Sequence, residues 1–188
     1  MANVHDVAKF FIDLAQKREQ QQRGDLVTNL RLQKLLYFAQ GWSLARYGKP
    51  LFDAPIEAWK FGPVVREVYN EYSANRANGI SSDARIDSDA LTSDELELLL
   101  DVAREYDRFS TNTLVDFSHV DDGPWAKVGR SEEIPVDEIK KYFEAQPPLP
   151  KFSDVLAQQD VITPRRDENG IAVLPSNFDD DWGEYDAD

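Results

Sequence analysis

Cysteine is absent from this 188-residue chain, which excludes disulfides, thiolate catalysis and cysteine-ligated zinc. Histidine is scarce: the two present, His5 and His119, do not stand in a spacing typical of a metal site, so we expect no metal ion. Glycine-rich phosphate loops, dinucleotide fingerprints and the G-x-S-x-G elbow of hydrolases are also missing. The sequence therefore predicts a protein that is not an enzyme and binds no cofactor.

Long apolar runs are missing as well. No stretch approaches the roughly 20 apolar residues that a membrane helix requires. The amino-terminal segment is interrupted by Asp6, Lys9 and Asp13, a pattern unlike that of a signal peptide. We therefore expect no membrane contact and a cytoplasmic protein.

The charge of the chain is strongly negative, with 35 acidic and 21 basic residues and a formal net charge of −14. Repulsion from phosphate backbones makes direct binding of nucleic acid unfavourable. The same charge favours a basic protein partner, because complementary electrostatic fields accelerate encounter.

Apolar residues recur at helical spacing through most of the chain, so the sequence predicts a mainly α fold. A first amphipathic helix is expected from Val4 up to a polar run that ends at Gly24. A longer helix is expected between an N-cap at Thr28 and Gly48, and its broad apolar stripe predicts a central position. The segment 92–95, Thr-Ser-Asp-Glu, is a capping box that predicts a further helix.

Prolines and glycines mark the remaining elements. The segment 51–61 alternates apolar and polar residues, which predicts a short strand or an extended loop. Gly62-Pro63 predicts a helix with Pro63 at its first position, and Pro135 predicts the same for the last helix. Another helix is expected after Ser110 or Thr111. The stretch from the Asn78-Gly79 turn to Ala90 is expected to be an exposed loop or a weak hairpin.

A proline cluster at 147, 148 and 150 predicts the boundary between a helical domain, 1–146, and an acidic tail, 147–188. The tail has 10 acidic and 3 basic residues, a net charge of −7, which is half of the charge of the chain. Its end interleaves aromatic with acidic residues, namely Phe178, Asp179, Asp180, Asp181, Trp182 and Tyr185. Such a segment is either a solvated tail or an anchor that folds onto a basic groove, and the sequence leaves both open.

His119 allows two interpretations. It stands in the sequence DFSHVDDGPW, where a neighbouring carboxylate could make it a catalytic base or a metal ligand. The alternative is a packed histidine that holds a turn, and the lack of further metal-ligand spacing favours this structural role. Aromatic residues Tyr37, Trp42, Trp59, Phe61 and Trp125 are expected in the core, although one or two could be exposed in a partner groove.

The order of these motifs resembles the Panacea domain over roughly residues 5–145. The residues that carry the resemblance are Thr28, Leu32 to Ala39, Gly41-Trp42, Leu44-Ala45, Gly48, Pro50 to Phe52, Ile56 to Trp59, Phe61 to Val65, Val68-Tyr69, Leu114-Val115, His119 and Pro124-Trp125. One departure is Ser118, where we expect threonine before the histidine. Each motif alone is weak, but the ordered set is specific.

The resemblance implies a compact multi-helix domain with a small β element that acts as a SocA-like antitoxin. Such a protein neutralises a co-encoded protein toxin by direct binding, and the toxins include enzymes acting on nucleotides or tRNA. An adaptor that delivers the toxin to a Clp-type protease is the alternative. Of the candidate residues, Trp59, Phe61, Phe178, Asp179, Asp180, Asp181, Trp182 and Tyr185 are expected to bind the toxin. The motif residues Thr28, Lys34, Tyr37, Trp42, Gly62, Pro63, His119, Pro124 and Trp125 are expected to be structural.

Overall fold

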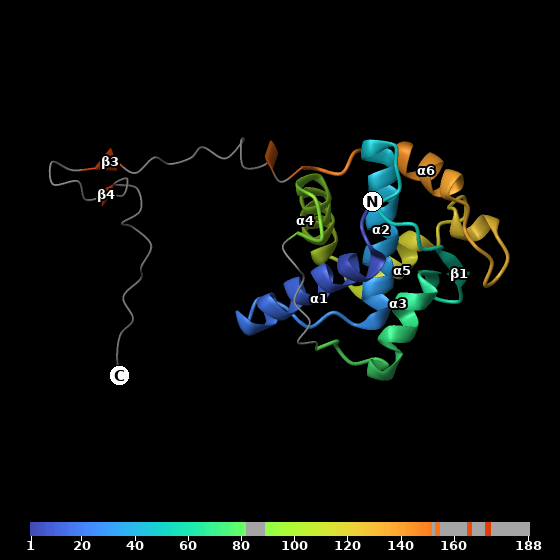
Figure 1. Cartoon of the computed structure of the whole chain (residues 1–188), viewed down its shortest axis with the longest axis horizontal. Helices are drawn as coiled ribbons and strands as arrows, with labels where there is room; N and C mark the ends of the chain where they lie inside the picture. The colour runs from blue at the N-terminus through green and yellow to red at the C-terminus, as the bar shows by residue number, and fades with distance from the viewer. Residues whose placement is uncertain (82–88, 152, 155–164, 167–171, 174–188) are drawn as a thin grey trace, which may run out of the picture. The chain divides into compact units, whose positions relative to one another are not determined.

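The computed structural model describes residues 1–81, 89–151, 153–154, 165–166 and 172–173, and the chain divides into two units, Met1–Phe152 and Ser153–Asp188. The described part of the first unit contains the helices α1 (Val4–Gln20), α2 (Asn29–Tyr47), α3 (Arg66–Glu71), α4 (Ser93–Asp107), α5 (Thr111–Ser118) and α6 (Val136–Glu144). It also contains the strands β1 (Glu57–Trp59) and β2 (Gly62–Val64) and two short 3₁₀ turns, η1 (Ser73–Asn75) and η2 (Trp125–Lys127). The predicted mainly α fold with a small β element is confirmed (Figure 1).

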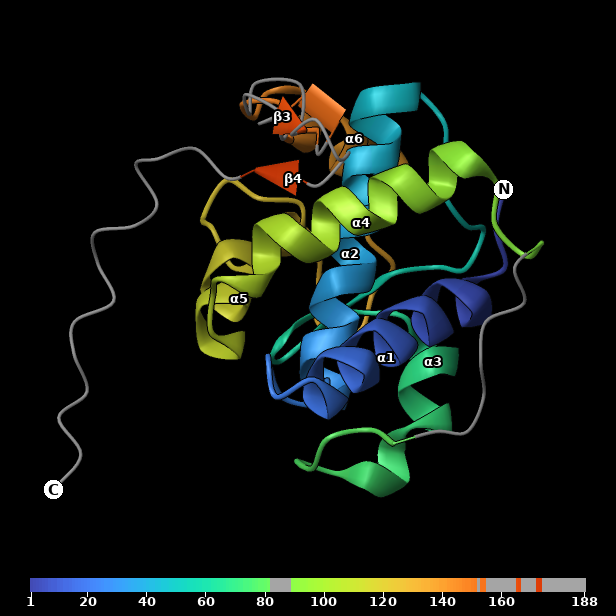
Figure 2. The same cartoon turned by 90° about the vertical axis from the view of Figure 1, so that its left-hand side faces the viewer.

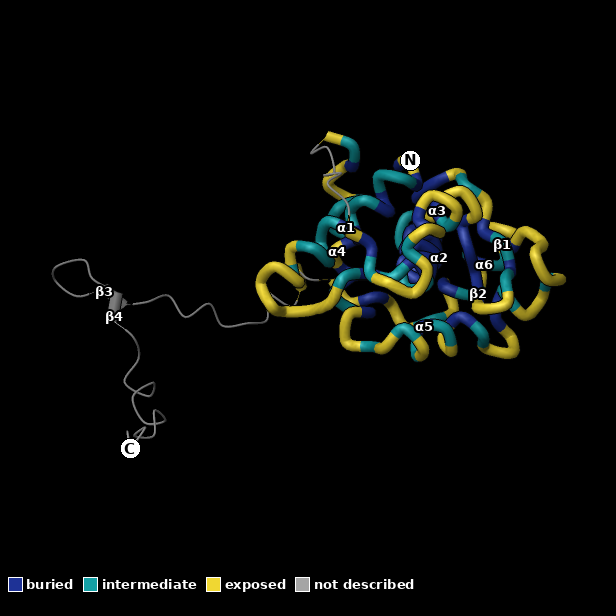
Figure 3. Tube along the Cα trace, turned by 90° about the horizontal axis from the view of Figure 1, so that it is seen from below, coloured by how far each residue is buried: buried dark blue, intermediate teal, exposed yellow. Residues whose placement is uncertain are grey.

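Helix α2 is the centre of the first unit, as its broad apolar stripe predicts. It contacts α1, α3, α4, α5, α6 and β2. In Figure 2, α1 and α4 cross in front of it. Its residues from Leu32 to Leu44 are all buried, and α2 accordingly appears in dark blue in Figure 3. A helix covered on so many sides is buried around most of its circumference, which agrees with the breadth of its apolar stripe.

The helix ends follow the capping signals of the sequence. The Thr28 side chain accepts a hydrogen bond from the Arg31 amide at 3.2 Å, and Gly48 closes α2 with φ of +70°. Thr92 and Glu95 form the predicted capping box at the start of α4. Ser110, the first of the two predicted starts, caps α5 through the amide of Thr113. Because each cap satisfies a backbone amide that the helix leaves unpaired, the short sequence motifs fix where these helices start.

The prediction that a helix begins at Pro63 is wrong. Pro63 lies in β2, paired with Ala58, and α3 begins later, at Arg66. The carbonyl group of Pro63 accepts a hydrogen bond from Lys34 Nζ at 2.9 Å, a contact that holds this backbone extended. Pro135 likewise precedes its helix instead of beginning it, because its ψ of 133° is extended and Val136 is the first residue of α6.

The loop after α3 pairs with the connection between α1 and α2. Gly79 forms an isolated antiparallel bridge with Thr28, and the Ile80 amide donates to the Val27 carbonyl oxygen at 2.8 Å. This segment therefore packs on the connection between α1 and α2. Residues 82–88 of the predicted loop or hairpin lie outside the described residues.

An aromatic cluster joins α2 to α4 and α6. The rings of Phe38 and Tyr106 stack at 4.1 Å, and Trp42 Nε1 donates to the Tyr106 hydroxyl at 2.9 Å. On the α6 side, the Phe143 ring lies so close to Gly41 that a Cβ atom there would be 2.3 Å from the ring. Glycine at this position therefore lets α6 approach the central helix.

A buried ion pair connects α2 to α4 and to the chain beyond α6. Arg46 Nη1 lies 2.7 Å from Asp101 Oδ2, and the Asp101 side chain is fully buried. Arg46 Nη2 also donates to the carbonyl oxygen of Leu149 at 3.2 Å, and Leu149 belongs to the core. Breaking such a pair from one side costs about 3–5 kcal/mol, so Arg46 fixes this part of the chain firmly.

In the second unit, the structure describes Ser153 and Asp154, which are helical, and an antiparallel pair of β3 (Arg165–Arg166) and β4 (Ala172–Val173). Arg165 pairs with Val173, and Arg166 pairs with Ala172. The division into a helical domain, 1–146, and an acidic tail, 147–188, stays a prediction. The tail residues predicted to bind the toxin lie outside the described residues.

Candidate functional site

The tip of the β1–β2 hairpin presents an aromatic side chain to solvent. Trp59 pairs with Gly62, so the turn between the strands consists of Lys60 and Phe61. The Phe61 side chain is 57% exposed, the most exposed large hydrophobic residue after Met1 among those described. Trp59 is half-buried. Of the five aromatic residues expected in the core, Tyr37 and Trp42 are buried there, whereas Phe61 is exposed, the alternative that was left open for one or two of them.

Beneath the hairpin lies a buried lysine from the central helix. Lys34 has no exposed surface, and its Nζ atom donates to the Pro63 carbonyl oxygen at 2.9 Å. Burial lowers the pKa of Lys34 to about 7, because desolvation disfavours the charged amine. The side chain therefore links α2 directly to the backbone of β2.

Gly62 is required at the end of the turn by both conformation and space. Its φ of +98° is a conformation that L side chains rarely adopt. A Cβ atom there would lie 2.4 Å from Lys34 Nζ and 2.5 Å from Ser118 Oγ. Ser118, the residue at which the sequence departs from the expected threonine, donates its hydroxyl to the Val115 carbonyl oxygen at 2.7 Å. Helices α2 and α5 thus meet the hairpin at this glycine.

His119 and Trp125 support the hairpin from the side of α5. Trp125 Nε1 donates to the Trp59 carbonyl oxygen at 2.8 Å. The His119 ring lies edge-on to the Trp125 ring at 4.0 Å, and its Nδ1 atom donates to the Val115 carbonyl oxygen at 2.7 Å. Pro124 is buried at the N-terminus of η2, just before Trp125. This arrangement favours the structural interpretation of His119.

The other edge of β1 is paired with the segment before α6. The Ala58 amide donates to the Glu132 carbonyl oxygen at 2.8 Å, and the Ser131 amide donates to the Ala58 carbonyl oxygen at 2.6 Å. Directly after β2, the Val65 amide donates to Gln33 Oε1 at 2.9 Å. Both strands of the hairpin are therefore fixed, and the motif residues Lys34, Gly62, Pro63 and Trp125 meet at this one element.

A groove of about 440 Å³ lies beside the exposed turn. Its lining combines aromatic, amide and basic side chains: Asn29, Leu30, Gln33, Trp59, Lys60, Phe61, Val64, Tyr69, Ser73, Arg76, Arg130 and Ser131. The rings of Trp59 and Tyr69 are 4.9 Å apart. Trp59 and Phe61, the two candidate binding residues that the structure describes, therefore lie together on one surface. No pattern in the sequence indicated Arg76 or Arg130.

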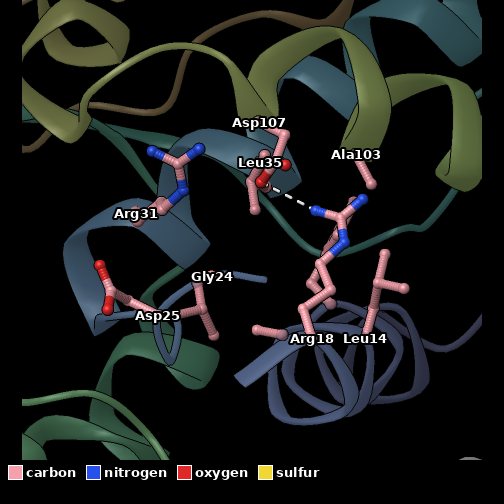
Figure 4. Close-up of a pocket in the computed structure, with 11 residues that line it drawn as sticks. Leu14, Arg18, Gly24, Asp25, Arg31, Leu35, Ala103 and Asp107 are labelled. Atoms are coloured by element: carbon pink, nitrogen blue, oxygen red, sulfur yellow. Dashed lines mark ion pairs between the residues drawn. The ribbon is translucent and has the colours of Figure 1, made fainter. Parts of the chain in front are cut away.

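Two arginines, Arg18 and Arg31, lie between α1, α2 and α4 and are labelled in Figure 4. Arg18 pairs with Asp107 at 2.8 Å, the dashed line in the figure. Arg31 donates to the carbonyl oxygens of Tyr106 and Phe109, at 2.9 and 2.8 Å, and so caps the end of α4. Arg18, Arg31 and Asp107 together line a cavity of about 50 Å³, and the internal contacts of the two arginines favour a structural role for them.

The structure also bears on histidine chemistry. The Nδ1 atom of His5 lies 2.6 Å from Glu71 Oε2, so this histidine links α1 to the end of α3. Among the described residues, no cluster of three histidine, aspartate or glutamate side chains could hold a metal ion. Within the same residues, no helix is both long and apolar enough to cross a bilayer.

Comparison with known proteins identifies the family of the chain. Residues 32–126 match the family model described as antitoxin SocA-like, Panacea domain, and the chain belongs to this family. It is 40% identical over 112 residues to the protein named antitoxin SocA of Caulobacter vibrioides (strain NA1000 / CB15N). That match covers 53% of this chain and 58% of the relative, which is less than two thirds of its length. No solved structure matches the chain.

Proposed function

We propose that this protein is an antitoxin that neutralises a protein toxin by direct binding. The family is one of antitoxins, and the curated relative carries that name. The observation that carries the binding mechanism is the hairpin, which is fixed from three sides and holds Phe61 57% exposed. A rigid, exposed aromatic side chain beside a groove is typical of interface hot spots, because little conformational entropy is lost when it is buried.

The net charge of −14 supports the same proposal and indicates the kind of toxin. A toxin that acts on nucleotides or tRNA needs a basic surface to bind its phosphate groups. An acidic antitoxin is attracted to that surface and competes with the substrate for it. We therefore propose that neutralisation occurs by occlusion of a substrate-binding surface.

Co-expression with the protein encoded by the neighbouring gene tests the proposal. We expect that the neighbouring protein alone stops growth, that this chain restores growth, and that the two co-purify as a complex. Toxin half-life should be unchanged by the antitoxin. Faster loss of the toxin would instead support delivery to a Clp-type protease. If growth is not restored and no complex forms, the proposed function is contradicted.

The acidic tail is proposed as a second contact with the toxin, through Phe178, Trp182, Tyr185 and the aspartates 179–181. Truncation after Lys151 is the appropriate test, because it keeps Leu149, which belongs to the core and binds Arg46. We expect the truncated chain to keep its melting temperature and to bind the toxin at least about ten-fold more weakly, because the aromatic anchors are lost. Titration of the toxin with both forms measures this change. Equal affinity of the two forms would show that the tail is only a solvated segment.

A further inference from the structure

Three cations surround the groove at the hairpin tip. Lys60, Arg76 and Arg130 line it, and within the described parts of the chain none of them forms an ion pair. By contrast, Arg66 on the neighbouring helix is paired with both oxygens of Glu57. In a protein with a net charge of −14, acids are available to neutralise surface cations. Three cations without an ion pair therefore lie around one exposed aromatic ring.

Backbone strain is concentrated at the same place. Arg76 and Ser131, which both line the groove, have φ values of +53° and +63°. Among the described residues, Gln22 is the only other non-glycine residue with positive φ. Such conformations are disfavoured for L residues and persist where the surrounding structure fixes them, often at binding sites. The backbone at two points of the rim is therefore held in an unfavourable geometry.

A second hollow adjoins the groove at the turn. This hollow has a volume of about 350 Å³ and shares Trp59, Lys60 and Arg130 with the first. Arg130 therefore borders both hollows. Two adjoining hollows fit an extended polypeptide segment better than a compact small molecule.

The amide groups of the groove argue against a nucleotide as the occupant. Asn29 Nδ2 donates to the Tyr69 carbonyl oxygen at 2.9 Å, and Gln33 Nε2 donates to Asn29 Oδ1 at 3.1 Å. Gln33 Oε1 accepts from the Val65 amide. These side chains are therefore engaged in holding the fold, whereas reading a base requires free donors and acceptors at its edge. The groove keeps aromatic faces and cations for its ligand.

We infer that this groove binds a carboxylate-bearing segment of the partner protein, with Arg76 and Arg130 pairing with its acidic side chains and Trp59 and Phe61 packing against its apolar ones. The inference rests on the proposed function, and it gives the interface two charge contacts of opposite sign. The acidic body attracts a basic surface of the toxin, and the basic groove selects an acidic segment. Arginine suits this role because its planar guanidinium binds a carboxylate through two hydrogen bonds.

Charge reversal at the groove gives a test in which the sign of the effect is decisive. Arg130→Glu and Arg76→Glu are each titrated with the purified neighbouring-gene toxin, next to Lys49→Glu. Lys49 is exposed, does not line the groove and gives the same change in net charge. We expect each groove variant to weaken binding at least about ten-fold, the scale of one charged hydrogen bond. Lys49→Glu should leave affinity unchanged or slightly improve it, as long-range attraction to a basic toxin requires.

A charge swap distinguishes the loss of a charge contact from misfolding of the variant. Replacing acidic residues of the toxin by lysine, one at a time, should identify a position that restores binding to Arg130→Glu. If the wild-type chain binds the toxin and Arg130→Glu binds it as tightly, the inference is wrong and the proposed function stands. If the wild-type chain binds no toxin, both fail. Displacement of the toxin by millimolar ATP, abolished by Arg130→Glu, would overturn the inference in favour of a small-anion site.

Discussion

Phe61→Ala is expected to weaken the complex with the toxin about 30-fold or more and to abolish rescue of growth at low expression. An aromatic residue that becomes fully buried at the centre of an interface contributes about 2 kcal/mol or more when it is truncated to alanine. The free protein loses little, because the side chain is already 57% exposed and the hairpin backbone is fixed by Lys34 and Trp125. Binding and stability should therefore separate.

Isothermal titration with the toxin and thermal melting of the free chain measure the two quantities. Leu100→Ala is the matched control: Leu100 is also a large hydrophobic residue, 45% exposed, but it lies on α4, which contributes no residue to the groove. We expect the control to bind like the wild type. If Phe61→Ala binds the toxin as tightly as the control does, the hairpin tip is not part of the interface.

Local signals predicted much of the fold. The capping box at Thr92, the N-cap at Thr28 and the closing Gly48 act within one helical turn, so the sequence alone reveals them. The error at Pro63 has a different origin. Proline after glycine is compatible with a helix start, but here a hydrogen bond from Lys34, distant in the sequence, holds the residue in a strand. A tertiary contact thus overrode a valid local preference.

The candidate site was predictable only in part. The motif resemblance named Trp59, Phe61, Gly62 and Trp125, but it could not show that they support one hairpin. Arg130 lies in a loop far along the chain, and it reaches the groove because the following segment pairs with β1. Such pairing depends on three-dimensional register, which no spacing along the chain encodes.

Lys34 was expected to be structural, and its burial makes that role measurable through pH. Lysine is rarely fully buried, because its charge must be desolvated. In the unfolded chain its pKa is 10.5, and burial lowers the pKa of Lys34 to about 7 in the native state. Between these values the unfolded chain binds a proton that the native protein lacks. The free energy of unfolding therefore rises with pH in this range, by up to roughly 1.4 kcal/mol per pH unit. Below about pH 7 Lys34 is protonated in both states, so it no longer makes the free energy of unfolding depend on pH.

Urea unfolding at several values between about pH 7 and pH 9.5 should reveal this rise, a range that lies below the ordinary titration of tyrosine. Above it, burial raises the pKa of Tyr37 and raises the pKa of Tyr106 to about 12, and these groups make stability fall with pH. Lys34→Met keeps the length of the side chain without a titrating amine, so the difference between the two proteins isolates Lys34. Parallel pH dependences would mean that the native amine stays charged, and the Pro63 carbonyl would then be binding an ammonium group inside the core.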